Sequence, residues 1–118
     1  VVSKEHDPST RDLPSRFVLE DEWYNVHPNP LDAGNVRLLL EVDDSTREST
    51  KGFFGHPGIY PGPHPVSWCH YYDGGRAWLT TLGHSEEIFT NTNYLTHILG
   101  GIESAMGRKP FCVAKSAE

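Results

Sequence analysis

The chain has 118 residues, the size of one domain, and a formal net charge of −6. Hydrophobic residues make up 36% and aromatic residues 11% of the chain, whereas disordered chains are poor in both. Only 10 Lys and Arg stand against 16 Asp and Glu, a balance that opposes contact with nucleic acid or an anionic membrane. Composition therefore predicts one globular domain that binds neither.

No apolar run approaches the roughly 20 residues that cross a bilayer, so the sequence predicts a soluble protein. The two cysteines, Cys69 and Cys112, form no CxxC pair and allow at most one disulfide, which leaves the redox compartment open. The chain starts at Val1 without an initiating Met or a signal-like stretch. This start predicts a processed chain or a piece of a longer one.

The first 35 residues are polar and interrupted by prolines, which predicts a surface segment with one helical turn at 13–17. Residues 36–42 are short and nearly continuously apolar, as is typical of a central strand. Residues 43–64 are rich in Gly and Pro. A loop of this length is uncommon in a compact domain and favours a lid or a binding loop.

The second half predicts a β-hairpin and a helix. Residues 65–72 and 76–82 flank a turn at 73–75, followed by Ser85 as the N-cap of a helical segment. Apolar residues at three- and four-residue spacing predict a last helix over 93–106, ended by Gly107. The glycine pair at 100–101 costs about 1 kcal/mol of helix propensity per glycine, which predicts close packing against a sheet or a ligand.

Five motifs, taken in order, connect the chain with a known family. They are His6-Asp7-Pro8 with Leu13-Pro14, Asp21-Glu22-Trp23-Tyr24, His64-Pro65-Val66-Ser67-Trp68, Gly74-Gly75-Arg76 and Leu82-Gly83-His84. With the closing helix, they resemble the ThuA-like family, known for trehalose utilisation, over nearly all of residues 5–107. Asp7 departs from the family, which more often places proline directly after the histidine.

The resemblance implies an α/β fold of the flavodoxin-like, class I glutamine amidotransferase-like kind, a three-layer sandwich. Residues 1–118 would be a single partial domain, the C-terminal half of that fold. The N-terminal half, which carries the first parallel strands and the turn where the amidotransferases place a nucleophilic cysteine, would lie outside this chain.

The best candidate for catalysis is His84, in Gly83-His84-Ser85-Glu86, where a strand gives way to a helix and ligands commonly bind. The motif is similar to the His-x-Glu element of the amidotransferases, in which histidine is the base and glutamate orients it. Glu86 would then be the orienting residue. The alternative is that His84 only caps the turn through hydrogen bonds.

A second candidate cluster, Asp21-Glu22-Trp23-Tyr24, places carboxylates beside aromatic rings. Glu22 could act as acid, base or hydroxyl acceptor, because an apolar neighbour raises a carboxyl pKa toward the useful range. Aromatic faces stack on sugar rings, so the residues expected to bind a saccharide are Trp23, Tyr24, His64, Trp68 and Arg76. An acidic surface loop with a buried Trp23, and an Arg76 paired with a carboxylate, are the alternatives.

A divalent metal would require His6, Glu22, His64 and His84 to converge in the fold, since no local ligand motif such as HExxH is present. We therefore assign no metal ligands, and a divalent ion stays open as a cofactor. His56 is a weaker candidate. His70 in a strand and His97 on the last helix are expected to be structural, and Cys69 is expected in the core.

The function implied by the resemblance is carbohydrate metabolism, with a disaccharide or an oxidised (keto) sugar as substrate. A non-catalytic carbohydrate-binding or interaction module and an inactive fragment of a larger protein are the alternatives, so the sequence leaves open whether the chain is an enzyme. The expected partners are a small saccharide and either a second copy or a second polypeptide that completes the domain.

Overall fold

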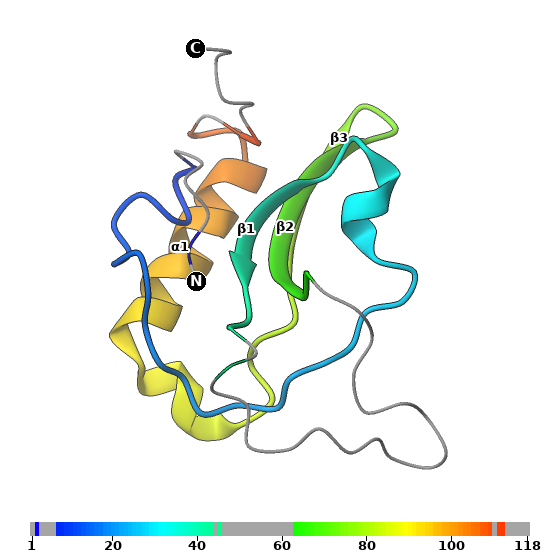
Figure 1. The fold of residues 1–118 in the computed structure, drawn as a ribbon. Coiled ribbons are helices and arrows are strands. Elements are labelled where there is room, and N and C mark those ends of the chain that lie inside the picture. Colours follow the sequence, from blue (N-terminus) through cyan, green and yellow to red (C-terminus); the bar gives the residue numbers. More distant parts are fainter. Residues whose placement is uncertain (1, 3–6, 44, 46–62, 110, 113–118) are drawn as a thin grey trace.

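The computed structural model describes residues 2, 7–43, 45, 63–109 and 111–112. Its strands are β1 (Arg37–Glu41), β2 (Pro65–Tyr72) and β3 (Gly75–Thr80), and its helices are the 3-10 segments η1 (Pro30–Ala33) and η3 (Glu86–Thr90) and the α-helix α1 (Thr92–Ala105). The strands form one antiparallel sheet in the order β1-β2-β3, with α1 packed beside it (Figure 1). The α/β class is confirmed. The parallel strands of a flavodoxin-like sandwich are not among the described elements.

The predicted hairpin is confirmed as β2 and β3. Its turn places Asp73 (φ 49°) and Gly74 (φ 76°) in the left-handed region. Two such residues form the turn whose twist matches that of the flanking strands. The hairpin aligns Cys69 with Trp78 and Tyr72 with Gly75, and this register sets where β3 ends and the following turn begins.

The expectation that residues 36–42 form a central strand is wrong, because β2 is the central strand of the described sheet and β1 lies at its edge. One isolated bridge, from Leu40 to Val2, touches β1 from the other side. Leu39 and Leu40 belong to two separate buried clusters. The run is apolar because consecutive side chains of a strand point in opposite directions and both sides are covered here.

The predicted last helix is confirmed as α1. The Asn91 side chain accepts a hydrogen bond from the Tyr94 N–H (3.1 Å) at its start. At its end Gly107 adopts φ 83°, and the N–H groups of Gly107 and Arg108 donate to carbonyls of the last turn. This is the glycine C-cap that satisfies the otherwise unpaired carbonyls of a helix.

The close packing expected at the glycine pair is also present. A Cβ on Gly100 would overlap the backbone of Pro8, and one on Gly101 would overlap the indole of Trp78 on β3. The glycines therefore let α1 approach both the N-terminal segment and the sheet. The residues of α1 that become buried are Tyr94, His97, Gly100, Gly101 and Ser104.

Two local expectations are wrong. Residues 13–17 form no helical turn; the turn lies earlier, at 8–12, where Thr10 and Arg11 donate to the Asp7 carbonyl. Ser85 precedes the 3-10 helix η3, but its side chain makes no capping bond. Its backbone N–H is instead engaged by a residue distant in sequence, as described below.

A buried polar network ties the N-terminal segment to β2, β3 and α1. His97 is fully buried, with Nδ1 2.7 Å from the Ser9 carbonyl oxygen and Nε2 2.9 Å from the Ser67 hydroxyl. The Trp78 indole N–H donates to the Ser9 hydroxyl (3.1 Å), which in turn donates to Asp7. Buried polar groups need such partners, and these place His97 in a structural role.

Cys69 is buried, as expected, and forms a disulfide with Cys112, 43 residues further along the chain. The loop predicted at 43–64 lies mostly outside the described residues, since 44 and 46–62 are not described. Among the described helices, none has the length and apolar character needed to span a bilayer.

Candidate functional site

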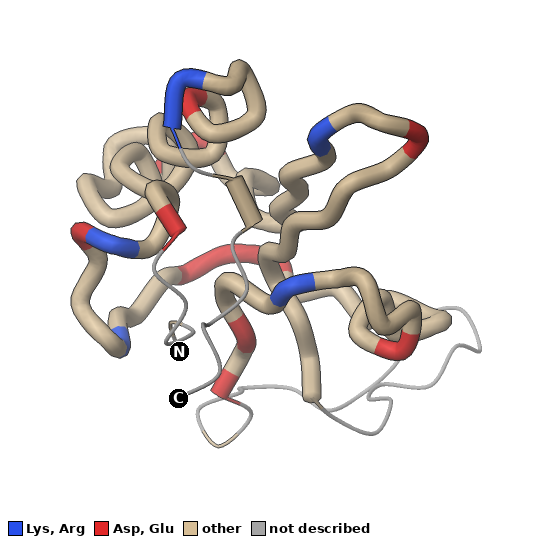
Figure 2. Tube along the Cα trace, turned by 90° about the horizontal axis from the view of Figure 1, so that it is seen from above, with Lys and Arg blue, Asp and Glu red and all other residues tan. Residues whose placement is uncertain are grey.

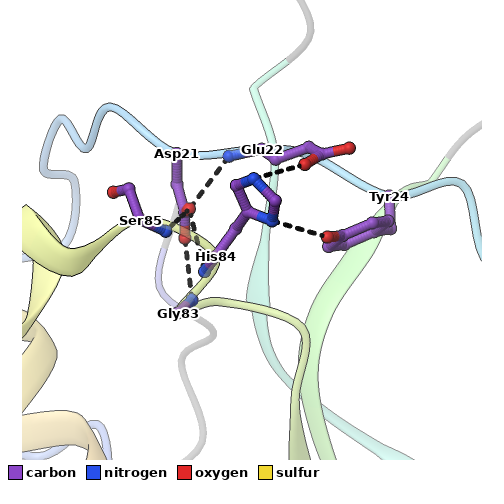
Figure 3. A network of polar contacts seen from close by, with 6 residues as sticks. All are labelled: Asp21, Glu22, Tyr24, Gly83, His84 and Ser85. Atoms are coloured by element: carbon purple, nitrogen blue, oxygen red, sulfur yellow. Dashed lines mark hydrogen bonds and ion pairs between the residues drawn. The ribbon is translucent and has the colours of Figure 1, made fainter.

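The candidate site forms where the segment 20–24 runs beside the turn that follows β3 (Figure 3). The Asp21 carboxylate accepts backbone hydrogen bonds from Gly83 (2.8 Å), His84 (3.2 Å) and Ser85 (3.3 Å). Three consecutive N–H groups on one carboxylate fix the backbone of His84 against this segment, and bonds to a charged acceptor are the stronger kind. Asp21 therefore fixes the backbone position from which the His84 ring projects.

Gly83 is required by this turn for two reasons. Its φ of 114° lies in a region that residues with a Cβ rarely adopt. A Cβ there would also stand 2.8 Å from the Tyr94 hydroxyl of α1. The glycine thus lets the chain leave β3, pass α1 closely and present its next residue, His84, to the Asp21 segment.

The His84 ring lies between two side chains of that segment (Figure 3). Its Nε2 is 2.9 Å from Oε2 of Glu22, and its Nδ1 is 3.3 Å from the Tyr24 hydroxyl. The side chains of His84 and Glu22 are 57% and 52% exposed. A polar contact this exposed contributes little to stability, so the arrangement is available for binding or chemistry.

The charges around Tyr24 act on its hydroxyl. Desolvation, followed by the charges of Glu22 and Asp21, raises the pKa of Tyr24 above its ordinary 10.0. The Tyr24 hydroxyl is therefore protonated at neutral pH, and it can donate to Nδ1 of His84 in the tautomer whose Nε2–H donates to Glu22. In that tautomer the lone pair of Nδ1 faces the Tyr24 hydroxyl.

The structure brings together three residues singled out in the sequence: Glu22, Tyr24 and His84. Glu86 is exposed in the first turn of η3, and the carboxylate on the imidazole is that of Glu22 instead. Sequence analysis did not assign Asp21 a role of its own. The sequence pointed to Asp21 only through its position beside Glu22, because backbone N–H groups are present at almost every residue and mark no partner in the sequence.

The other residues expected to bind a saccharide make none of these contacts. Trp23 is half-buried against the core, and Trp68 and His64 are buried, at 7% and 8% exposure. Arg76 donates to the Ser104 carbonyl (2.7 Å) at the end of α1 rather than to a carboxylate. Tyr24, at 45% exposure, is the expected sugar-stacking aromatic that is most open to solvent.

Within residues 7–43 and 63–109, together with 2, 45 and 111–112, no three His, Cys, Asp or Glu side chains gather in a position to hold a metal ion. His6 and His56 lie outside these residues. Lys and Arg are spread over separate parts of the described trace (Figure 2).

Comparison with known proteins completes this description. A family model described as "ThuA: Trehalose utilisation" matches residues 1–105. The chain belongs to the ThuA family. Both halves of the candidate site, at 21–24 and 83–85, lie inside the match, and the family's description gives this ThuA chain a carbohydrate-related role. A search of curated proteins and a search of solved structures found no match.

Proposed function

We propose that this ThuA-family chain carries out general acid–base chemistry on a carbohydrate, with His84 as the base. The observation that supports this proposal is the imidazole held between Glu22 and Tyr24, with its backbone fixed by Asp21. A histidine whose one nitrogen is bonded to a carboxylate while the other faces a hydroxyl is the arrangement that general-base sites use.

The proposed substrate is a disaccharide or its oxidised form, a sugar with a ring ketone. A carbonyl acidifies the C–H bond next to it, so the chemistry within reach of this site is removal of that proton. The substrate displaces the Tyr24 hydroxyl from Nδ1 of His84. Nδ1 then takes the proton, the C–H electron pair moves to the carbonyl oxygen, and the Tyr24 hydroxyl donates a hydrogen bond to the resulting oxyanion. Glu22 stabilises the imidazolium that forms.

We also propose that the chain is the C-terminal half of an amidotransferase-like α/β sandwich. The exposure of the site supports this, because the side chains of His84 and Glu22 are 57% and 52% exposed, as expected of a site that further residues complete. The groups proposed for proton removal nevertheless all belong to this chain, so it can be tested for that step by itself.

The test is exchange of the carbon-bound proton with solvent deuterium. A keto derivative of trehalose is incubated with the chain in D₂O, and loss of the signal of the proton beside the ketone is followed by NMR. His84→Ala should slow this loss by about 10²- to 10⁴-fold and leave sugar affinity within a few-fold. Glu22→Gln should alter the pH–rate profile, and Tyr24→Phe should slow exchange by about 10²- to 10³-fold.

Two matched variants serve as controls. Glu20→Gln changes an exposed carboxylate two residues from Glu22, and Tyr72→Phe changes an exposed tyrosine at the end of β2. Neither should alter exchange. Saturable binding of the sugar without exchange would instead favour the carbohydrate-binding module. Exchange that persists in His84→Ala would refute the role of His84.

A further inference from the structure

The outer face of α1 is apolar. Leu95, Leu99, Ile102 and Met106, the last at its C-cap, are 46%, 58%, 50% and 61% exposed. The face of α1 that packs inward has Tyr94 and Ile98 as its apolar contacts, together with two glycines, a serine and a histidine. A helix that covers a sheet normally has its apolar stripe inward and polar residues outward, whereas α1 carries a further apolar stripe on its outer face. The outer face therefore has the composition of a contact surface.

The four side chains recur at intervals of four, three and four residues. This is the a/d spacing of two helices that pack side by side. At about half exposure each offers on the order of 100 Å², so one copy presents roughly 400 Å² of contiguous apolar surface. That is the range of functional patches on monomers, and with a polar rim it approaches the area of roughly 800 Å² per partner in a specific interface.

The stripe is complementary to itself when two copies of α1 run antiparallel. About a two-fold axis midway between Leu99 and Ile102, each Leu99 lies opposite the partner's Ile102. In the same register each Leu95 lies opposite the partner's Met106. Every layer then joins an a position to a d position, as antiparallel helix pairs require. Two-fold symmetry also closes the assembly at two copies.

The charges at the two ends of α1 favour the same arrangement. Glu86 and Glu87 lie in the segment η3 immediately before the helix. Arg108 and Lys109 follow its C-cap and are exposed. An antiparallel pair brings the basic end of each copy toward the acidic start of the other, whereas a parallel pair would place like charges together.

We propose that this stripe is the contact surface of an antiparallel homodimer of the chain. The partner that covers this stripe is a second copy of the chain, because the apolar layers and the charges at the two ends of α1 are each complementary to themselves. The residues that carry this inference, on the outer face of α1 and at its ends, are different from Asp21, Glu22, Tyr24 and His84. The test of the homodimer is therefore independent of the test of the proposed chemistry.

Sedimentation equilibrium of the 118-residue chain tests the proposal at concentrations up to about 1 mM, a range that detects even a weak dimer. Leu99→Glu and Ile102→Lys, each at an exposed position, should each raise the dimer Kd at least about tenfold, because each buries a charge against an apolar side chain. Tyr72→Glu, at a 74% exposed position on the hairpin, is the matched control and should leave the Kd unchanged.

Mixing the two charged variants tests the register. In the antiparallel arrangement one Glu then meets one Lys and the other layer keeps Leu against Ile, so the mixture should dimerise more tightly than either variant alone. A parallel pair would not be rescued, because position 99 would then face position 99. Circular dichroism checks folding, and Leu95→Glu mixed with Met106→Lys repeats the experiment on the outer layer.

A chain that stays monomeric to about 1 mM overturns the proposal. So does a dimer that survives Leu99→Glu, a dimer that Tyr72→Glu disrupts equally, or a mixture without rescue.

Discussion

Replacing Asp21 by asparagine should loosen the candidate site without removing any group that would touch a substrate. The carboxylate of Asp21 is half-buried and accepts the N–H groups of Gly83, His84 and Ser85 at 2.8 to 3.3 Å. In the shape-matched variant Asp21→Asn, one oxygen becomes an NH₂ group. The amide places this donor at the Oδ2 position, where it faces only the Gly83 N–H, because Oδ1 accepts the other N–H groups.

The magnitude follows from these bonds. Each hydrogen bond to a charged group is worth about 1.5 to 3 kcal/mol when buried, and partial exposure of Asp21 reduces that value. We expect the variant to lose one bond outright and weaken the others, lowering the free energy of unfolding by about 2 kcal/mol. Urea unfolding followed by tryptophan fluorescence measures this loss.

A second readout separates positioning from general destabilisation. In the wild type, ¹⁵N NMR should show the Nε2–H tautomer of His84, held by Glu22 and Tyr24. In Asp21→Asn the two tautomers should mix, because the ring is no longer fixed against those partners. Asp12→Asn, an exposed carboxylate beside Arg11, should change neither quantity. An unfolding free energy within 0.5 kcal/mol of the wild type, with an unchanged tautomer, would refute this reasoning.

Three further predictions concern the scaffold. Burial lowers the pKa of His97 to about 4 from 6.5, so the unfolded chain binds a proton between these values that the folded chain does not. The contribution of His97 to the free energy of unfolding should be complete above pH 6.5 and fall by up to about 3 kcal/mol toward pH 4. Urea unfolding midpoints at several pH values measure this. The same dependence on pH in His97→Gln would contradict it. Gly101→Ala should destabilise by about 2 to 4 kcal/mol through overlap with Trp78, despite better helix propensity, and a higher melting temperature would disprove the close contact. Cys112→Ser opens the disulfide to Cys69 and should cost about 2 to 4 kcal/mol, whereas a melting temperature insensitive to reductant would show that the bond is absent in solution.

The elements that could be predicted from the sequence are those with local determinants. The Asp73-Gly74 turn requires left-handed backbone, which fixes the hairpin, and Gly107 ends α1 for the same reason. Periodicity located the helix but could not tell which face of it is buried. The face against the sheet is built around Gly100 and Gly101, because close backbone approach needs small residues, and that contact depends on where Trp78 lies.

The candidate site was also predicted only in part from the sequence. The sequence by itself determined that Glu22, Tyr24 and His84 carry suitable groups and that a glycine turn follows β3. Only the tertiary structure decided that Glu22, 62 positions before His84, is the carboxylate on its ring, rather than Glu86 two residues away. In the turn that leads into η3 the backbone of His84 is bonded to Asp21, and this long-range contact directs the ring toward the segment 20–24. Backbone conformation follows from neighbouring residues, but the pairing of side chains distant in sequence follows from how the whole chain packs.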